Sequence, residues 1–238
     1  MRVVLLTTGG DYGRRIAEGL AERGVPLAAI VLDLFRPRLA VAVRRPRRAI
    51  GPFRRWVGAR DLSAHAPLRI AGNLNDRRST EMLRALRPDL LVLGGARILS
   101  RAVLETASWG ALNAHPAHLP GFRGTGVVGW SILRGVPVTA TVHVVSPDVD
   151  AGDVVERRLV PVEPGDTLAD IQGRADRLCA RALADVAAAV WRGEEIAREP
   201  QQATPEVLRW LDPGQRAQAE ELVRSGEAMR LYRGVARD

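Results

Sequence analysis

The N-terminal part of the chain contains two apolar runs with one amphipathic segment between them. This arrangement limits the possible folds more than any other feature of the sequence. Residues 2–7 (RVVLLT) and 26–32 (PLAAIVL) are short, apolar and rich in β-branched side chains, as buried strands are. Residues 12–23 between them carry apolar side chains at helical spacing, and Gly24 follows as a helix stop. Two fully apolar strands joined by a helix are typical of a parallel sheet covered by helices.

Predicted strands and helices continue to follow one another along the chain as far as residue 192. Further strands are predicted at residues 67–70, 89–95, 110–115, 137–146 and 154–160, the last as a hairpin-like return, and helices at residues 77–86, 101–106, 125–133 and 168–192. We therefore predict an α/β fold with a Rossmann-like, doubly wound, mostly parallel sheet and flanking helices. Ligands of such sheets bind beyond the carboxyl ends of the strands.

The chain divides into a main domain over residues 1–197 and a short C-terminal extension over residues 198–238, which is polar and a candidate dimer element. An Arg-rich insertion lies at about residues 34–65. All 35 basic residues of the chain are Arg, and the net charge is +8. We interpret the insertion as a solvated surface segment. The alternative is a surface that faces an anion or a nucleic acid.

Cysteine and histidine usage limits the chemistry and the compartment. Cys179 is the only cysteine, so no intrachain disulfide can form, and a reducing cytoplasm is the natural location. The first apolar run is too short for a signal peptide, and no run reaches membrane-spanning length. Four scattered histidines lack zinc-site spacing, so we expect no metal. A membrane partner is not expected, and a nucleic acid is the less favoured partner.

Three polar side chains can meet at the end of the predicted sheet. Asn113 and His115 stand two apart on one strand, so they point to the same face. Asp150 ends a loop after the strand at residues 137–146. An amide, an imidazole and a carboxylate together can stabilise an oxyanion and move a proton, which are the needs of acyl transfer to an amine.

Residues 113–124 read N-x-H-P-x-x-L-P-x-F-R-G, and this motif resembles the folate-dependent formyltransferase family. That family includes glycinamide ribonucleotide transformylase, the catalytic domain of methionyl-tRNA formyltransferase and sugar N-formyltransferases. Three more segments resemble the family in the same order: residues 97–100 (RILS), 142–145 (VHVV) and 150–153 (DAGD). Together the four matches cover roughly residues 88–168.

The resemblance implies an enzyme that uses 10-formyltetrahydrofolate as co-substrate and no metal. It implies that Asn113, His115 and Asp150 are catalytic, with Asp150 orienting His115 and relaying the proton of the amine. Backbone groups of Arg97, Ile98 and Leu99 would hold the pterin. A loop would close over the folate, and its residues are Ser146, Pro147, Asp148 and Val149.

The resemblance leaves the acceptor open. Weaker candidates for substrate contacts are Gly10, in a turn that is equally a tight strand-to-helix connection, His118 and Arg123. Chain length and tail favour the amine of a nucleotide-linked amino sugar or a similar small metabolite. The alternatives are glycinamide ribonucleotide, a hydroxylated diamine and an aminoacyl-tRNA or carrier-bound amine. An inactive folate-binding or interaction protein is the alternative that is not an enzyme.

Overall fold

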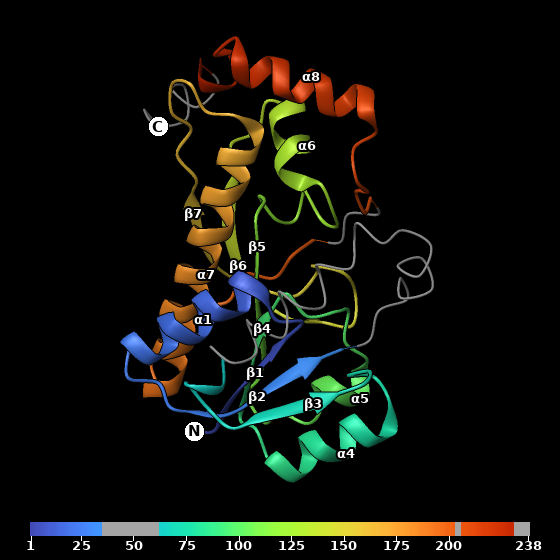
Figure 1. Ribbon diagram of the computed structural model, residues 1–238, viewed down its shortest axis with the longest axis vertical. Coiled ribbons are helices and arrows are strands. Elements are labelled where there is room, and N and C mark those ends of the chain that lie inside the picture. Colours follow the sequence, from blue (N-terminus) through green and yellow to red (C-terminus); the bar gives the residue numbers. More distant parts are fainter. Residues whose placement is uncertain (35–61, 203–205, 231–238) are drawn as a thin grey trace. The chain divides into compact units, whose positions relative to one another are not determined.

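The computed structural model of the chain describes residues 1–34, 62–202 and 206–230 (Figure 1). The chain forms two compact units: Met1–Asn113 with Leu183–Glu195 is unit 1, and Ala114–Ala182 with Ile196–Asp238 is unit 2. Strand β5 (Gly110–His115) and helix α7 (Leu168–Arg192) each contribute residues to both units. Most of the predicted Arg-rich insertion lies outside the described residues.

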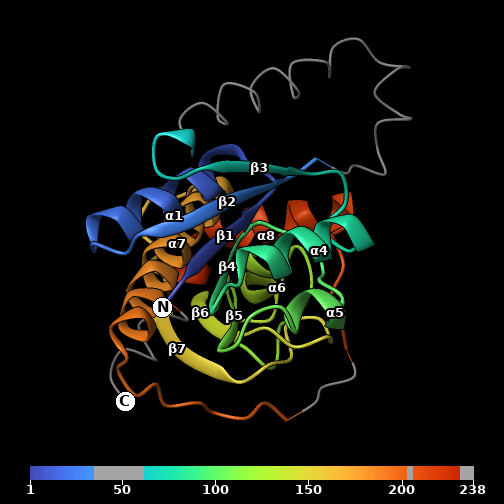
Figure 2. The ribbon, with the colours of Figure 1, turned by 90° about the horizontal axis from the view of Figure 1, so that it is seen from below.

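Unit 1 contains the parallel part of the sheet. Its strands are β1 (Val3–Thr7), β2 (Leu27–Asp33), β3 (Leu68–Ala71), β4 (Leu90–Gly94) and the start of β5. They pair in the order β3-β2-β1-β4-β5, each parallel to its neighbour, and Figure 2 shows β3, β2 and β1 side by side. Every residue of β1 and of β4 is buried, as the uninterrupted apolar runs predicted.

Three helices of unit 1 follow from local sequence signals. They are α1 (Gly10–Glu22), α4 (Arg77–Leu86) and α5 (Arg101–Leu104). Helix α1 begins two residues before the predicted start, because Gly9 adopts a φ of 79° and turns the chain directly from β1 into the helix. Asp76 caps α4 by accepting a hydrogen bond from the backbone N–H of Ser79. Figure 2 shows α1 and α4 on opposite sides of the strands.

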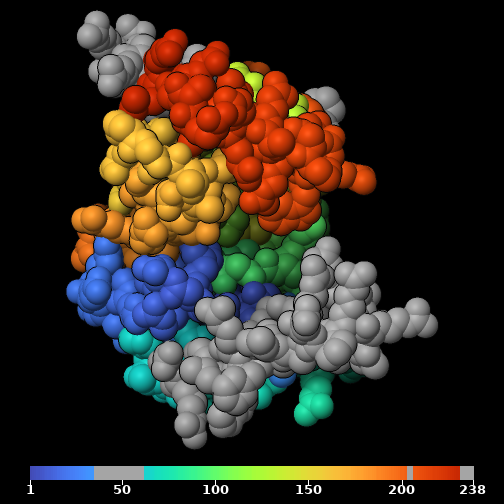
Figure 3. Space-filling model, turned by 45° about the horizontal axis from the view of Figure 1, so that its top comes forward, coloured from blue at the N-terminus to red at the C-terminus, as the bar shows by residue number. Residues whose placement is uncertain are grey.

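Unit 2 is built from a strand pair and three helical segments. It contains α6 (Val127–Leu133), β6 (Thr139–Val144), β7 (Val154–Leu159), α8 (Pro213–Arg224) and the first part of α7. Strands β6 and β7 pair antiparallel, as the predicted hairpin-like return requires. Helix α8 packs on α6, and Figure 3 shows it in red on the surface of this unit.

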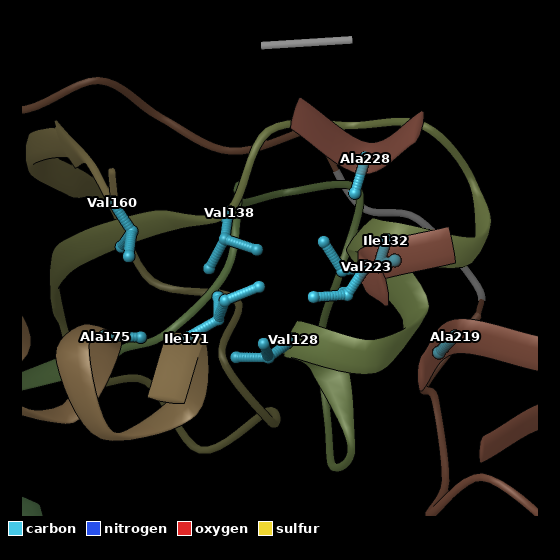
Figure 4. Packing of buried hydrophobic residues seen from close by; sticks show 9 residues of the cluster. All are labelled: Val128, Ile132, Val138, Val160, Ile171, Ala175, Ala219, Val223 and Ala228. Atoms are coloured by element: carbon cyan, nitrogen blue, oxygen red, sulfur yellow. The ribbon is translucent and has the colours of Figure 1, made fainter. Parts of the chain in front are cut away.

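The core of unit 2 joins its helices and strands through aliphatic side chains (Figure 4). Its buried members come from α6, α7, α8, the segment that follows α8 and the segments beside β6 and β7, and they are Val128, Ile132, Val138, Val160, Ile171, Ala175, Ala219, Val223 and Ala228. The members from α6, α7 and α8 lie on the apolar stripe of each helix, which is why these helices pack there. Burying one such large side chain contributes about 1.5–3 kcal/mol.

Among the described residues, seven strands form a sheet with the order β3-β2-β1-β4-β5-β6-β7. The predicted α/β fold with a mostly parallel sheet and flanking helices is therefore confirmed. Within the described ranges, no helix has both the length and the apolar character needed to cross a membrane.

Candidate functional site

Strand β5 carries Asn113 and His115, and its bounds agree with the prediction. Asn113 is half-buried, and His115 is buried. The Nε2 atom of His115 lies 2.8 Å from the carbonyl oxygen of Phe122. Because a carbonyl oxygen can only accept, Nε2 carries the hydrogen of this bond, and Nδ1 is the nitrogen that faces the rest of the site.

Asp150 lies in the middle of a group of polar atoms. One oxygen of its carboxylate, Oδ2, accepts a hydrogen bond from the backbone N–H of Gly124 at 3.0 Å and lies 3.6 Å from Nδ1 of His115. The other oxygen, Oδ1, lies 3.7 Å from Nε2 of His143. The structure thus brings His115 and Asp150 together, as predicted, and adds His143 as a neighbour.

His143 is on β6 and is 2% exposed. Its Nδ1 lies 3.0 Å from the carbonyl oxygen of Val144, so Nδ1 donates and Nε2 points to the carboxylate of Asp150. Burial lowers the pKa of His143, and the nearby carboxylate opposes this shift only in part. A neutral His143 leaves the negative charge of Asp150 available to other groups.

A cavity of about 660 Å³ opens beside His115 within unit 2. Its wall is formed by the chain before α6, the first turns of α7 and the segment that leads into α8. The lining residues are His115, Pro116, Gly124, Thr125, Gly126, Val127, Gly129, Leu168, Ala169, Gln172, Gly173, Asp176, Trp210, Leu211 and Arg216. Its volume falls in the range of small-molecule sites, about 300–1,000 Å³.

The residues predicted to hold a pterin follow β4 in unit 1. Arg97 forms a two-pronged ion pair with the fully buried carboxylate of Asp33, with Nε–Oδ2 and Nη2–Oδ1 distances of 2.5 and 3.1 Å. The side chain of Asn75 donates to the carbonyl of Ile98 at 2.9 Å and accepts from the N–H of Ser100 at 2.8 Å. This segment is therefore held by its neighbours, while the Ile98 side chain stays 65% exposed.

The predicted folate loop joins β6 to β7 in unit 2. Ser146 and Val149 are half-buried, whereas Pro147 and Asp148 are exposed. The hydroxyl of Ser146 donates to the carbonyl of Asp148 at 3.2 Å, which closes a local turn. Two of the four residues thus present their side chains to solvent.

The three weaker candidates lie in different settings. Gly10 begins α1 in unit 1 with a φ of 86°. His118 is exposed and is not among the residues that line the cavity. Arg123 is 7% exposed, and its Nη1 lies 3.5 Å from the carbonyl oxygen of Val149, so it contacts the predicted folate loop.

A sequence profile described as "Formyl transferase" matches residues 1–187. The chain belongs to the formyl transferase family. The resemblance to folate-dependent formyltransferases and the prediction of an enzyme that transfers a one-carbon group are therefore confirmed.

Individual relatives agree with the family. The methionyl-tRNA formyltransferase of Moorella thermoacetica is 28% identical over 98% of this chain and 79% of its own length. Glycinamide ribonucleotide transformylase 1 from Symbiobacterium toebii has a similar structure, with a TM-score of 0.60, 25% identity, and coverage of 89% of this chain and 95% of its own.

A sugar-modifying neighbour shares the fold. The formyltransferase PseJ from Anoxybacillus kamchatkensis, solved with UDP-4,6-dideoxy-4-formamido-L-AltNAc and tetrahydrofolate, has a TM-score of 0.56 at 17% identity and covers 93% of this chain and 98% of its own. The relatives and neighbours thus agree on the formyl transferase fold.

The cavity of this formyl transferase includes side chains that the sequence did not single out. Asp176 and Gln172 stand one turn apart on α7, where Gln172 donates to Asp176 at 2.8 Å, and burial raises the pKa of Asp176. Two polar residues at i and i+4 beside the apolar stripe of α7 were the available signal. Trp210 and Arg216 come from the C-terminal extension, and no motif marks them.

Several expectations stay predictions for this family member. They are the domain boundary at residue 197, the cytoplasmic location, the homodimer and the roles of the individual site residues.

Proposed function

We propose that the protein is an N-formyltransferase that moves the formyl group of 10-formyltetrahydrofolate to a primary amine. The observation that carries this proposal is the Asp150 carboxylate beside His115 at the wall of a cavity of about 660 Å³. In the reaction the bond between the formyl carbon and N10 breaks, and a bond from that carbon to the amine forms. The amine loses one proton, and N10 gains one.

The donor would bind at residues 97–99. The supporting feature is a segment that is held on both sides, by Asp33 through Arg97 and by Asn75 through the Ile98 carbonyl. Its exposed Ile98 offers an apolar surface that a flat pterin ring could cover. PseJ, a neighbour with the same fold, was solved with tetrahydrofolate.

Three side chains would carry the chemistry. Asn113 would donate a hydrogen bond to the formyl oxygen as it becomes an oxyanion, and His115 would do so through Nδ1 when both of its ring nitrogens carry a hydrogen, because Nε2 already donates to Phe122. Losing one such donor costs about 3 kcal/mol in the barrier. Asp150 would accept the proton of the attacking amine. The Gly124 N–H and the neutral His143 support this role, because the first orients the carboxylate and the second does not neutralise it.

A small amine fits the cavity as acceptor. The first candidate is a nucleotide-linked amino sugar, because Trp210 offers a face for stacking and Arg216 a cation for phosphate at the cavity wall. The polar groups of Gln172 and Asp176 could bind hydroxyls. The second candidate is methionyl-tRNA, which the 28% identity to a methionyl-tRNA formyltransferase favours.

The test is turnover with 10-formyltetrahydrofolate and a panel of amines. The panel contains nucleotide-linked amino sugars, methionyl-tRNA, glycinamide ribonucleotide and hydroxylated diamines, and mass spectrometry detects one added formyl group. A formylated amino sugar supports the first acceptor, and formylated methionyl-tRNA with a steep salt dependence supports the second. Absence of transfer to every amine, together with no binding of tetrahydrofolate, would contradict the proposal.

A further inference from the structure

The C-terminal extension contacts the chain around Asp150 through Glu199, Gln201 and Leu208, all within unit 2. We define the strap as residues 196–202 and 206–211. Glu199 pairs with Val154, each backbone N–H donating to the other's carbonyl at 2.8 Å. Leu208 donates to the carbonyl of Arg123 at 2.8 Å and accepts from the N–H of Thr125 at 2.9 Å. The strap is thus bonded both to the edge of β7 and to the chain beside Gly124.

Between these contacts, the side chain of Gln201 reaches the loop that carries Asp150. Its Nε2 donates to the carbonyls of Asp150, at 3.1 Å, and of Gly152, at 2.5 Å. Because both partners are carbonyl oxygens, only the nitrogen end of the amide can face them. Among the residues that the structure describes, the buried Oε1 atom of Gln201 has no hydrogen-bond partner. The amide therefore holds the two carbonyls although its own oxygen makes no hydrogen bond to the described part of the chain.

The loop needs such support because its backbone is unusual. Asp150 has a φ of 47°, in the left-handed region that residues other than glycine rarely adopt. At Gly152 an added Cβ would lie 1.9 Å from the Val144 carbonyl oxygen, so only glycine fits this turn. One amide bonded to the carbonyls of residues 150 and 152 favours this conformation over others.

The left-handed backbone determines where the Asp150 carboxylate points. In this conformation the carboxylate accepts from the Gly124 N–H and faces both histidines. We propose that Gln201 is a positioning residue, which holds the backbone of Asp150 so that its carboxylate stays between His115 and His143. The inference rests on the proposed role of Asp150 in formyl transfer.

The first experiment measures position without using activity. Amide hydrogen exchange is followed at Gly124, whose N–H is bonded to the Asp150 carboxylate, in wild type, Gln201→Leu and Gln202→Leu. Gln202 is the matched control, because it is the neighbouring residue of the same type and is exposed. We expect Gly124 to exchange about ten times faster in Gln201→Leu and at the wild-type rate in Gln202→Leu. Wild-type exchange in both variants would overturn the proposal.

The second experiment measures catalysis with 10-formyltetrahydrofolate and the acceptor identified by the panel above. Gln201→Leu should lower kcat by about 100-fold, because a misplacement near 1 Å costs about that much, while the acceptor KM and the affinity for tetrahydrofolate stay within about twofold. An unchanged kcat, or a parallel loss of tetrahydrofolate affinity and melting temperature, would overturn a positioning role. If wild type neither transfers a formyl group to any amine nor binds tetrahydrofolate, the proposed function fails, and the Gly124 exchange still tests Gln201.

A third variant covers the case in which Gln201→Leu does not fold. Gln201→Glu places a carboxylate against two carbonyl oxygens, and only its protonated form can donate a hydrogen bond. Its kcat relative to wild type should therefore rise at least about threefold as the pH falls from 7.5 to 5.5. A constant ratio between these pH values would count against Gln201 as a donor to the loop.

Discussion

Two irregular segments follow strands of this molecule, and they differ in one anchor. After β4, residues 97–100 are held through their own side chain Arg97, which pairs with the buried Asp33, as well as through their backbone, which Asn75 binds. After β6, residues 146–153 are held by their backbone, because Gln201 binds the carbonyls of Asp150 and Gly152. We propose that the first arrangement leaves the exposed Ile98 side chain to meet a ligand, and that the second holds the Asp150 carboxylate in place for chemistry.

The largest effect should come from the segment that presents a side chain. Asp150→Asn keeps the shape of the side chain but removes the carboxylate that we propose takes the proton, so kcat should fall by about 10²–10⁴-fold. The measurement is formation of formylated product at saturating substrates. Glu194→Gln, which removes an exposed carboxylate paired with Arg192, is the control and should transfer at the wild-type rate. Transfer by Asp150→Asn at more than a tenth of the wild-type rate would remove Asp150 from the mechanism.

A change in the support of residues 97–100 should weaken tetrahydrofolate binding instead. Asp33→Asn weakens the anchor of Arg97, so the dissociation constant for tetrahydrofolate should rise about tenfold and the free energy of unfolding should fall by about 1.5–3 kcal/mol. Fluorescence titration and urea unfolding measure the two. Glu81→Gln breaks an exposed ion pair with Arg77 on α4 and should change the stability by less than about 1 kcal/mol. An unchanged tetrahydrofolate affinity in Asp33→Asn would contradict the anchoring role.

A smaller effect is expected at Asn75, the second support of residues 97–100. Asn75→Ala removes the hydrogen bonds to Ile98 and Ser100, so stability should fall by about 1–2 kcal/mol and the tetrahydrofolate dissociation constant should rise about threefold. Calorimetric titration measures the affinity. A lower transfer rate at saturating donor, with an unchanged tetrahydrofolate affinity, would show that residues 97–100 act in the chemical step. That result would contradict their assignment to donor binding.

The smallest effect is a pH dependence confined to the neighbourhood of Asp150. Burial holds the pKa of His143 below its ordinary value, so the folded protein binds a proton at this residue less readily than the unfolded chain. The stability due to neutral His143 is full above about pH 6.5 and is lost as the pH falls below it, by at most about 1.4 kcal/mol per pH unit.

Urea unfolding at pH 7.5 and 5.5 measures this loss. His143→Gln, which cannot titrate in this range, should lose less stability than wild type between the two pH values. An equal loss in both proteins would mean that other groups cause the acid sensitivity.

Local patterns account for what could be predicted from the sequence. The bounds of α4, α7 and β5 follow from spacing and caps that act within a few residues, and the two-residue interval put Asn113 and His115 on one face. The position of Asp150 after a strand suggested that it could meet these two residues, and the motif resemblance supplied its predicted catalytic role, because no spacing rule predicts how its loop closes.

Long-range pairing accounts for what could not be predicted. Asp33 and Arg97 are separated by 64 positions, and Gln201 and Asp150 by 51. Neither pair shows a periodic signal, because each side chain is polar and stands at the end of a strand or in an irregular segment. The roles of Asp33 at the end of β2 and of Gln201 in the polar C-terminal segment depend on the atoms that they contact in the folded chain, so the sequence alone does not indicate them.

We propose that residues 97–100 bind the donor and that residues 146–153 perform the transfer. The most direct test measures two constants, the tetrahydrofolate dissociation constant and the single-turnover transfer rate at saturating donor, on both Asp33→Asn and Asp150→Asn. The account predicts a reciprocal result: Asp33→Asn loses affinity and keeps its rate, while Asp150→Asn keeps its affinity and loses its rate. Two variants that lose the same constant, or an Asp150→Asn protein with the wild-type rate, would contradict it.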